Sequence, residues 1–302
     1  MDMKKLLFIM NPYAGTRRAN RYLSDIIGIF NAADYEVTVY MTSGPGNCRQ
    51  IVEDRAAEAD LLVCCGGDGT FNEALSGLMS RGLDMPIGYI PAGSANDFAN
   101  SLHLSLNVCQ AARDIVSGQV ARYDAGRFGD RIFSYVASFG AFTRTSYATP
   151  QPLKNVLGHA AYVLQGVQEL TQLHTEHIRL ELDDGTVVED DFLFGAISNS
   201  TSMGGVLTLD PKQVDLRDGK FEVLLIRSPR DLVELTECII ALQRQDYSCR
   251  MITFLSTSRV TVTAPKEMAW TLDGEHAPGQ EQVEIVCLNQ AIRLMKKEEQ
   301  DA

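Results

Sequence analysis

The stretch LLVCCGGDGT at residues 61–70 joins an apolar run to a glycine-rich turn and decides the class of the fold. A short apolar run that is bounded by turn residues is typical of a buried strand. The residues that follow, from about 71 to 78, continue as a helix. Glycines at such a turn let backbone N–H groups approach an anion, and the N-terminus of the helix adds a favourable dipole. An ordinary strand-to-helix turn is the alternative, and the glycines around Asp68 with a hydroxyl at Thr70 fit it poorly.

Strands and helices alternate on both sides of this stretch. Strands are expected at residues 6–10, 37–41 and 86–90, and helices within residues 17–33, 47–59 and 108–117. Repeated β-α-β units predict a parallel, doubly wound sheet with helices on both faces, so the expected fold class is α/β.

The pattern changes near residue 121. β-like segments follow at residues 121–139, 176–182, 186–198, 221–227, 251–263 and 281–288, and helical patterns are confined to 155–173 and 232–243. Turn residues between neighbouring strands are typical of antiparallel hairpins, so this half is predicted to be a mainly antiparallel β-sandwich. The expected domains are 1–121 and 122–290, followed by a charged tail, 291–302, that is free to return to the first domain.

The composition is that of an acidic globular protein. Its 302 residues carry 39 acidic and 27 basic side chains, a formal net charge of −12, which argues against a nucleic-acid binder held by a general positive field. Seven cysteines without a CxxC pair indicate free thiols in a reducing compartment. No apolar stretch approaches the ~18 residues needed to cross a bilayer, so we expect a cytoplasmic protein whose membrane contact is peripheral. Aromatic and basic residues between 122 and 154 form a weak candidate patch for that contact, or else part of a β-domain core.

Two more loops occupy the matching place in neighbouring β-α-β units. NPYAG at residues 11–15 follows the first strand, and PAGSANDFA at residues 91–99 follows the fourth. Because the carboxyl ends of parallel strands share one edge of the sheet, the three loops are expected to converge where open α/β sheets bind their ligands. The P-loop pattern GxxxxGK[ST] is absent, and the glycine turn lacks the third glycine of the dinucleotide fingerprint, so hydride chemistry on NAD is not expected.

The second half contributes two acidic motifs. In WTLDGEH at residues 270–276, Asp273 and Glu275 are two apart and would point the same way in extended backbone. A carboxylate there could accept a proton from a substrate hydroxyl, and an acidic turn with a surface His276 is the alternative. Asp215 and Asp218 could hold a hard, oxygen-loving cation, or they could belong to an ordinary hairpin turn.

Together these motifs resemble the diacylglycerol kinase catalytic family, and the bacterial soluble lipid kinases have the most similar pattern. The resemblance runs from about residue 5 to residue 294 with motif order and spacing intact. It implies a lipid kinase that transfers the γ-phosphate of ATP to the hydroxyl of a diacylglycerol-like acceptor with Mg²⁺. It also implies that the nucleotide lies in a cleft between an NAD-kinase-like α/β domain at 1–121 and a β-sandwich at 122–290 that takes the lipid.

The resemblance implies roles for individual residues. Glu275 matches the base that deprotonates the lipid hydroxyl, Asp273 matches its acidic catalytic neighbour, and Asp68 matches a ligand of the catalytic Mg²⁺. We expect Asp68 to face metal and phosphate from an exposed loop. A structural Mg²⁺ site is matched by Asp215, Asp218 and the backbone carbonyl of Lys220. The positions that match the nucleotide side are Asn11, Pro12, Ala14, Gly15, Thr42, Gly66, Gly67, Asp68, Gly69, Thr70, Asn72, Glu73, Gly93, Ser94, Asn96 and Asp97.

A few positions depart from the family pattern. Ser94 stands where the family often has Thr, Asn100 stands where a basic residue often follows, and the glycine run at residues 203–205 is short. These departures leave Asp68 and Glu275 untouched. The expected partners are ATP and a lipid acceptor at a membrane surface, and a homodimer is left open.

Two other functions stay open beside the lipid kinase. One is a kinase of a soluble hydroxylated metabolite, of the NAD kinase type, because such enzymes share the GGDGT motif. The other is a non-catalytic regulator that binds nucleotide or lipid. A protein without activity would be free to lose either Asp68 or Glu275, and this chain retains both.

Overall fold

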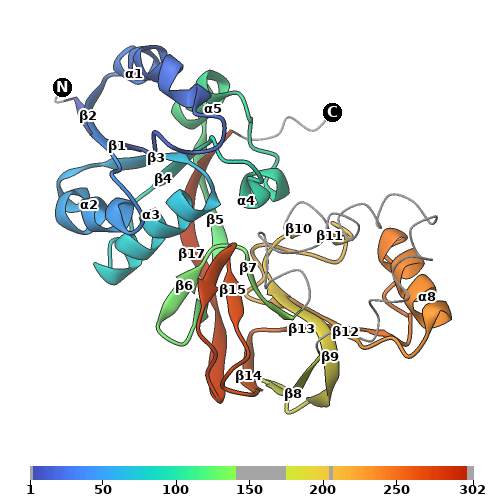
Figure 1. Cartoon of the computed structure of the whole chain (residues 1–302). Helices are drawn as coiled ribbons and strands as arrows, with labels where there is room; N and C mark the ends of the chain where they lie inside the picture. Colours follow the sequence, from blue (N-terminus) through green and yellow to red (C-terminus); the bar gives the residue numbers. More distant parts are fainter. Residues whose placement is uncertain (1–2, 141–174, 204–206, 298–302) are drawn as a thin grey trace. The chain divides into compact units, whose positions relative to one another are not determined.

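The computed structural model describes residues 3–140, 175–203 and 207–297. The helix expected at 155–173, the candidate membrane patch from residue 141 onward and most of the glycine run at 203–205 lie outside the described residues. The chain divides into two units (Figure 1). The first contains residues 1–125 and 289–302, and the second contains residues 126–288. The expected boundaries were 121 and 290.

The sheet of the first unit is parallel and doubly wound, as the sequence predicts. Its strands lie in the order β17 (Gln282–Lys296), β4 (Ile87–Pro91), β3 (Leu61–Gly66), β1 (Lys4–Met10) and β2 (Tyr35–Met41). All four neighbouring pairs are parallel. The chain moves outward from β1 to β2 and then returns to the other side of β1 for β3, so the order reverses between β1 and β3. In open α/β sheets, ligands bind beyond the carboxyl ends of the strands at such a reversal.

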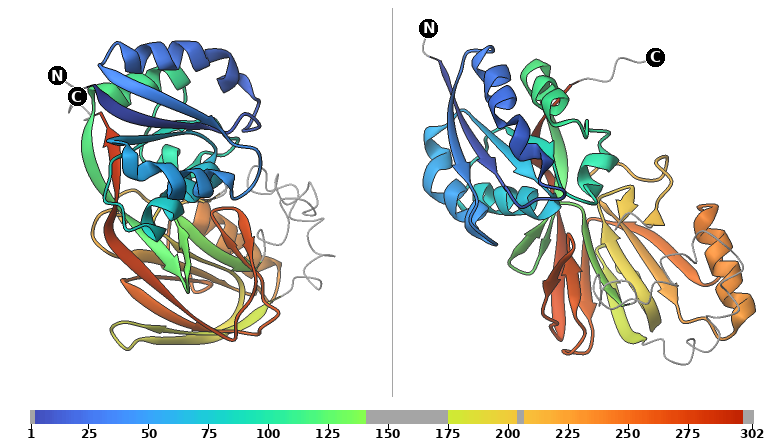
Figure 2. Two further views of the ribbon diagram at one scale, coloured as in Figure 1. Left: turned by 90° about the vertical axis from the view of Figure 1, so that its left-hand side faces the viewer. Right: turned by 45° about the horizontal axis from the view of Figure 1, so that its top comes forward.

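Helices cover both faces of this sheet, which explains why every residue of β3 is buried. The helices α1 (Leu23–Asn31) and α5 (Val108–Ser117) pack on one face, and α2 (Asn47–Arg55) and α3 (Asp68–Ser80) lie on the other (Figures 1 and 2). Short helical segments complete the unit: η1 (Arg18–Tyr22), η2 (Ala56–Glu58) and α4 (Asp97–Ser101). The sequence pattern does not reveal α4, and α3 begins three residues earlier than the expected position 71 because the polar residues of the turn form its first turn.

The second unit is mainly antiparallel, as predicted. Its main path runs β16 (Glu275–Ala277), β15 (Trp270–Leu272), β7 (Val136–Gly140), β9 (Val187–Ser198), β8 (Glu176–Leu182), β14 (Arg259–Thr263) and β17. Off this path, β12 (Phe221–Arg227) pairs with β9 and with β13 (Ile252–Thr257), and β6 (Arg131–Phe133) pairs with β5 (Gln119–Phe128). The other elements among the described residues of this unit are β10 (Ser202–Met203), β11 (Leu207–Thr208) and α8 (Leu232–Gln243).

Aromatic side chains fill the core of the second unit. The Trp270 ring lies 5.0 Å from the ring of Phe128 and 5.0 Å from that of Phe139, measured between centroids, with edge-on geometry in both cases. Such edge-to-face pairs are favourable beyond the area that they bury. Trp270 begins the strand β15, which leads into Asp273-Gly274-Glu275, called the DGE motif below, so this packing fixes the strand from which the motif extends.

The strand β17 is longer than the pattern at 281–288 indicates. It continues to Lys296, and Leu294 pairs with Ile87 of β4. The apolar alternation is broken at Gln290, which has a φ of 53° and whose N–H donates to the buried carboxylate of Asp124 at 2.6 Å. In the part of the chain that the structure describes, no helix is long and apolar enough to cross a membrane.

Candidate active site

Three loops leave the first sheet at the carboxyl ends of adjacent strands, where the sequence predicts that they converge. The strand register places Met10 beside Cys65, and Gly66 beside Pro91. The pairing continues into the loops. The N–H of Asn11 donates to the Cys65 carbonyl at 2.8 Å, and the N–H of Ala92 donates to the Gly66 carbonyl at 2.7 Å. Loops 11–15, 66–70 and 91–97 therefore lie side by side.

Glycines let these loops touch backbone to backbone. A Cβ at Gly93 would lie 2.5 Å from the Cα of Gly67, which is closer than any real contact of a Cβ. Gly15 has a φ of 48°, and a Cβ there would overlap the carbonyl oxygen of Ala92. No side chain fits at either position, so a ligand that reaches this edge can approach the backbone itself. Such surfaces of backbone N–H groups bind phosphate groups well.

Asp68 lies within this cluster rather than in an exposed loop. It is the first residue of α3, its exposed fraction is 9%, and its carboxylate accepts the N–H groups of Asp97 at 3.2 Å and Phe98 at 3.4 Å. The expectation of an exposed Asp68 was wrong because loop 91–97 folds over the start of α3. Asp68 therefore joins two of the three loops.

The other side chains of the cluster also connect loops. The amide nitrogen of Asn11 donates to the Thr70 hydroxyl at 3.1 Å. Asn96 has a φ of 53°, and its side-chain amide accepts the N–H of Gly93 at 2.9 Å and donates to the Gly93 carbonyl at 3.1 Å. Asn96 therefore shapes its own loop, while Ser94 is exposed and its hydroxyl can reach a ligand.

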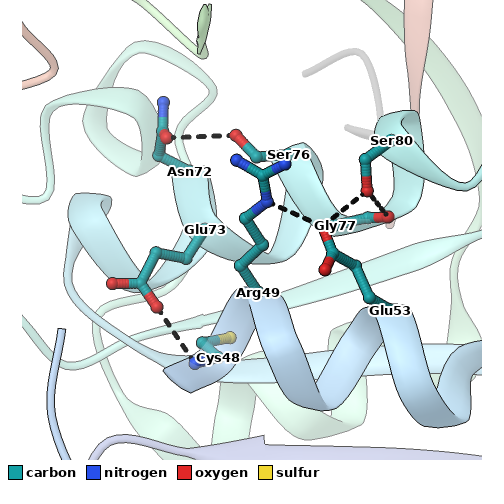
Figure 3. A network of polar contacts seen from close by, with 8 residues as sticks. All are labelled: Cys48, Arg49, Glu53, Asn72, Glu73, Ser76, Gly77 and Ser80. Carbon is teal, nitrogen blue, oxygen red and sulfur yellow. Dashed lines mark hydrogen bonds and ion pairs between the residues drawn. The ribbon is translucent and has the colours of Figure 1, made fainter. Parts of the chain in front are cut away.

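Glu73 and Asn72 make their contacts within the helical layer (Figure 3). The Glu73 carboxylate accepts the N–H of Gly46 at 2.7 Å and that of Cys48 at 3.0 Å, and so it caps the N-terminus of α2. The Asn72 side-chain oxygen accepts the Ser76 hydroxyl at 3.4 Å, one turn along α3. These hydrogen bonds join α3 to the start of α2 and run along α3.

The residues of the loop edge suit a nucleotide with Mg²⁺. The carboxylates of Asp68 and Asp97 and the hydroxyl of Thr70 are oxygen groups of the kind that this ion prefers, and Mg²⁺ in phosphoryl-transfer sites is usually held by one or two carboxylates together with substrate phosphates. A carboxylate offers more acceptor sites than the N–H groups of Asp97 and Phe98 use, so these hydrogen bonds are compatible with binding of a cation. Within residues 3–140, 175–203 and 207–297, no group of three or more His, Cys, Asp or Glu side chains is placed to hold a metal by itself.

Asp124 is a residue of this unit that the sequence reasoning missed. Its carboxylate is fully buried on β5 and accepts the N–H of Gln290. Nothing in its local sequence distinguishes it from a surface aspartate of a strand, because its partner is 166 positions away.

The DGE motif forms a tight hairpin in the second unit. Asp273 and Gly274 have φ values of 48° and 84°, the pattern of a two-residue type I′ turn, and Leu272 pairs with Glu275 across it. The two carboxylates therefore do not point the same way, because Asp273 lies in the turn rather than in an extended strand. Glu275 and His276 are exposed, whereas Asp273 is 5% exposed.

The Asp273 carboxylate is surrounded by donors from residues 134–136. One oxygen accepts the N–H of Ser134 at 2.5 Å and its hydroxyl at 2.7 Å, and the other accepts the N–H groups of Tyr135 and Val136, both at 3.0 Å. Burial raises the pKa of the Asp273 carboxyl, and these hydrogen bonds oppose the rise. The carboxylate is bonded to protein on both oxygens and has little access to a substrate.

Asp215, Asp218 and Lys220 are exposed. The Asp215 carboxylate accepts the N–H of Arg217 at 3.0 Å, and the Asp218 carboxylate accepts the N–H of Lys220 at 2.9 Å. These are two successive turns in which an aspartate side chain bonds to the backbone two residues on. Each carboxylate keeps acceptor sites that a hard cation could use.

Comparisons with known proteins agree with this architecture. The family model of the diacylglycerol kinase catalytic domain matches residues 5–128, and that of the YegS C-terminal NAD kinase beta sandwich-like domain matches residues 137–296. A diacylglycerol kinase of Bacillus subtilis is 28% identical over 98% of both chains. A diacylglycerol kinase of Staphylococcus saprophyticus is 30% identical over 90% of this chain and 89% of the relative.

A solved structure has the same fold. The crystal structure of a diacylglycerol kinase from Bacillus anthracis str. Sterne matches with a TM-score of 0.74 and 20% identity over 98% of each chain. The family models and the sequence relatives together identify the chain as a kinase. It belongs to the diacylglycerol kinase catalytic family.

Proposed function

We propose that the chain transfers the γ-phosphate of ATP to the hydroxyl of a diacylglycerol-like lipid, with Mg²⁺. The observation that supports this most strongly is the edge where loops 11–15, 66–70 and 91–97 meet through glycine backbone beside two carboxylates. A lipid acceptor is favoured by the names of the relatives, which are diacylglycerol kinases.

The first unit binds the nucleotide in this proposal. The phosphates would be held by backbone N–H groups around Gly67 and Gly93 and by the exposed Ser94 hydroxyl. Asp68 and Asp97 would hold Mg²⁺, which would offset the phosphate charge. Phosphoryl transfer demands mainly positioning and charge neutralisation from the protein, so the absence of a P-loop lysine is no obstacle.

The second unit supplies the base. Glu275 is exposed at the start of β16 and can meet the hydroxyl of an acceptor. Its carboxylate takes the hydroxyl proton as the acceptor oxygen bonds to the γ-phosphorus, and the bond from that phosphorus to the bridging oxygen of ADP breaks. The products are ADP and a phosphorylated lipid, and the enzyme later releases the proton to solvent.

The test is phosphate transfer from labelled ATP to diacylglycerol in mixed micelles, with NAD at millimolar concentration as the competing acceptor. We expect label in the lipid, a requirement for Mg²⁺ and no label in NAD. Efficient phosphorylation of NAD would favour a kinase of a soluble metabolite. Nucleotide binding without transfer to any acceptor would favour a regulator.

The proposal includes a structural cation at Asp215 and Asp218. A ligand that binds only the folded state stabilises it by mass action, so a chelator should lower the melting temperature of the protein even without nucleotide. Asp218→Ala should remove this dependence on divalent metal, whereas the exposed Asp184→Asn, in a turn elsewhere in the same unit, should keep it. Identical melting curves with and without chelator would mean that Asp215 and Asp218 belong to an ordinary turn and hold no structural cation.

A further inference from the structure

The Asp273 carboxylate accepts every hydrogen bond that residues 134–136 donate to it. Its two oxygens receive three backbone N–H groups and the Ser134 hydroxyl, and the segment 134–136 that supplies them is buried. Each oxygen of Asp273 accepts at least one backbone N–H. In an asparagine at this position, either orientation of the side-chain amide would place its NH₂ group against one of these N–H donors. A leucine would leave the donors unpaired, which is costly in a buried site. The site therefore specifies a carboxylate.

The same residue connects the segment 134–136 to Glu275. The N–H of Asp273 donates to the Val136 carbonyl at 2.9 Å, so main chain and side chain of Asp273 both bond to this segment. Asp273 and Gly274 form the whole turn, and Glu275 follows immediately as the partner of Leu272. A shift of the Asp273 carboxylate moves the turn, and a shift of the turn moves Glu275.

We infer that Asp273 is a positioning residue, which together with the Ser134 hydroxyl fixes the turn that carries Glu275 and aims its carboxylate at the acceptor. This inference rests on the proposed role of Glu275 as the base. Ser134 is the only side-chain donor among these four hydrogen bonds, because the other three come from the main chain. It is therefore the group that a substitution can remove without changing Asp273.

The first measurement compares Ser134→Ala with wild type. A general base contributes ~10²–10⁴-fold to kcat, and a misaligned base loses part of that contribution. We expect Ser134→Ala to lower kcat about 10-fold. The KM for ATP should not change, because nucleotide contacts lie on the first unit. Ser134→Cys keeps a weak donor and should give an intermediate kcat. Ser200→Ala is the matched control, since its buried hydroxyl bonds to the main chain of Ser202 and it should keep the wild-type kcat.

The second measurement repeats Ser134→Ala in a Glu275→Gln background. If Ser134 acts through Glu275, removing the hydroxyl has little further effect on kcat once the base is gone, and we expect less than about a two-fold change. An equal loss of kcat in both backgrounds, or a wild-type kcat for Ser134→Ala, overturns the inference. Melting curves of all variants are recorded so that kcat is compared at a temperature where each is folded.

The two hypotheses fail separately in this design. If Glu275→Gln has an unimpaired kcat, Glu275 is not the base, and the positioning role of Asp273 and Ser134 is contradicted as well. A strongly impaired Glu275→Gln beside an unimpaired Ser134→Ala removes the inference alone and leaves the proposed function in place.

Discussion

Replacing Glu275 with glutamine should lower kcat for a lipid acceptor by ~10²–10⁴-fold, the usual contribution of a general base. The amide keeps the shape of the side chain and can still hydrogen-bond to the acceptor hydroxyl, but it cannot take its proton. Glu275 is exposed next to the turn, so the substitution should cost little stability. The measurement is steady-state kinetics with diacylglycerol in mixed micelles, together with nucleotide affinity. The affinity should be nearly unchanged, because the nucleotide contacts that we propose lie on Gly67, Gly93 and their neighbours.

The matched control is Glu281→Gln, which makes the same chemical change at an exposed glutamate of the second unit. We expect this variant to keep the wild-type kcat. If Glu275→Gln were as active as the control, Glu275 could not be the base.

Replacing Asp68 with asparagine should reduce turnover at least ~100-fold, in the range that follows loss of a charge that stabilises the transition state. The amide has one acceptor oxygen and weakens any hold on a cation. The structure adds a second effect, because the carboxylate oxygens accept the backbone N–H groups of Asp97 and Phe98 at the start of α4. In the variant, an NH₂ group meets one of those donors, which should lower the free energy of unfolding by about 1–3 kcal/mol.

Two measurements separate the effects of Asp68→Asn. The melting temperature reports the cost to the fold, and kcat measured below that temperature reports the loss of catalysis. Asp54→Asn, at an exposed position on α2, is the matched control and should change neither. A variant of Asp68 with near-normal kcat, or one whose activity falls only in step with its unfolding, would contradict a role for this carboxylate in the reaction.

The sequence alone predicted the class of the fold and the convergence of the three loops. Apolar runs such as LLVCC are buried strands because helices must cover both faces of a parallel sheet, and this pattern can be recognised from local composition. The three loops converge because the carboxyl ends of parallel strands share an edge, which follows from the order of elements along the chain. The prediction of an antiparallel second half rests on the same kind of local signal.

Only the tertiary structure decided what individual polar side chains do. Asp68 is buried because loop 91–97 folds over it, Glu73 caps a helix that begins 26 positions earlier, and Asp273 bonds to residues 137–139 positions away. Nothing in the local sequence marks these partners, because a hydrogen bond between distant segments depends on how strands and loops pack. The order of elements thus determined that the three loops converge. Tertiary packing decided that the carboxylates of Asp68 and Asp273 are buried and bonded to distant main chain, whereas Glu275 is exposed.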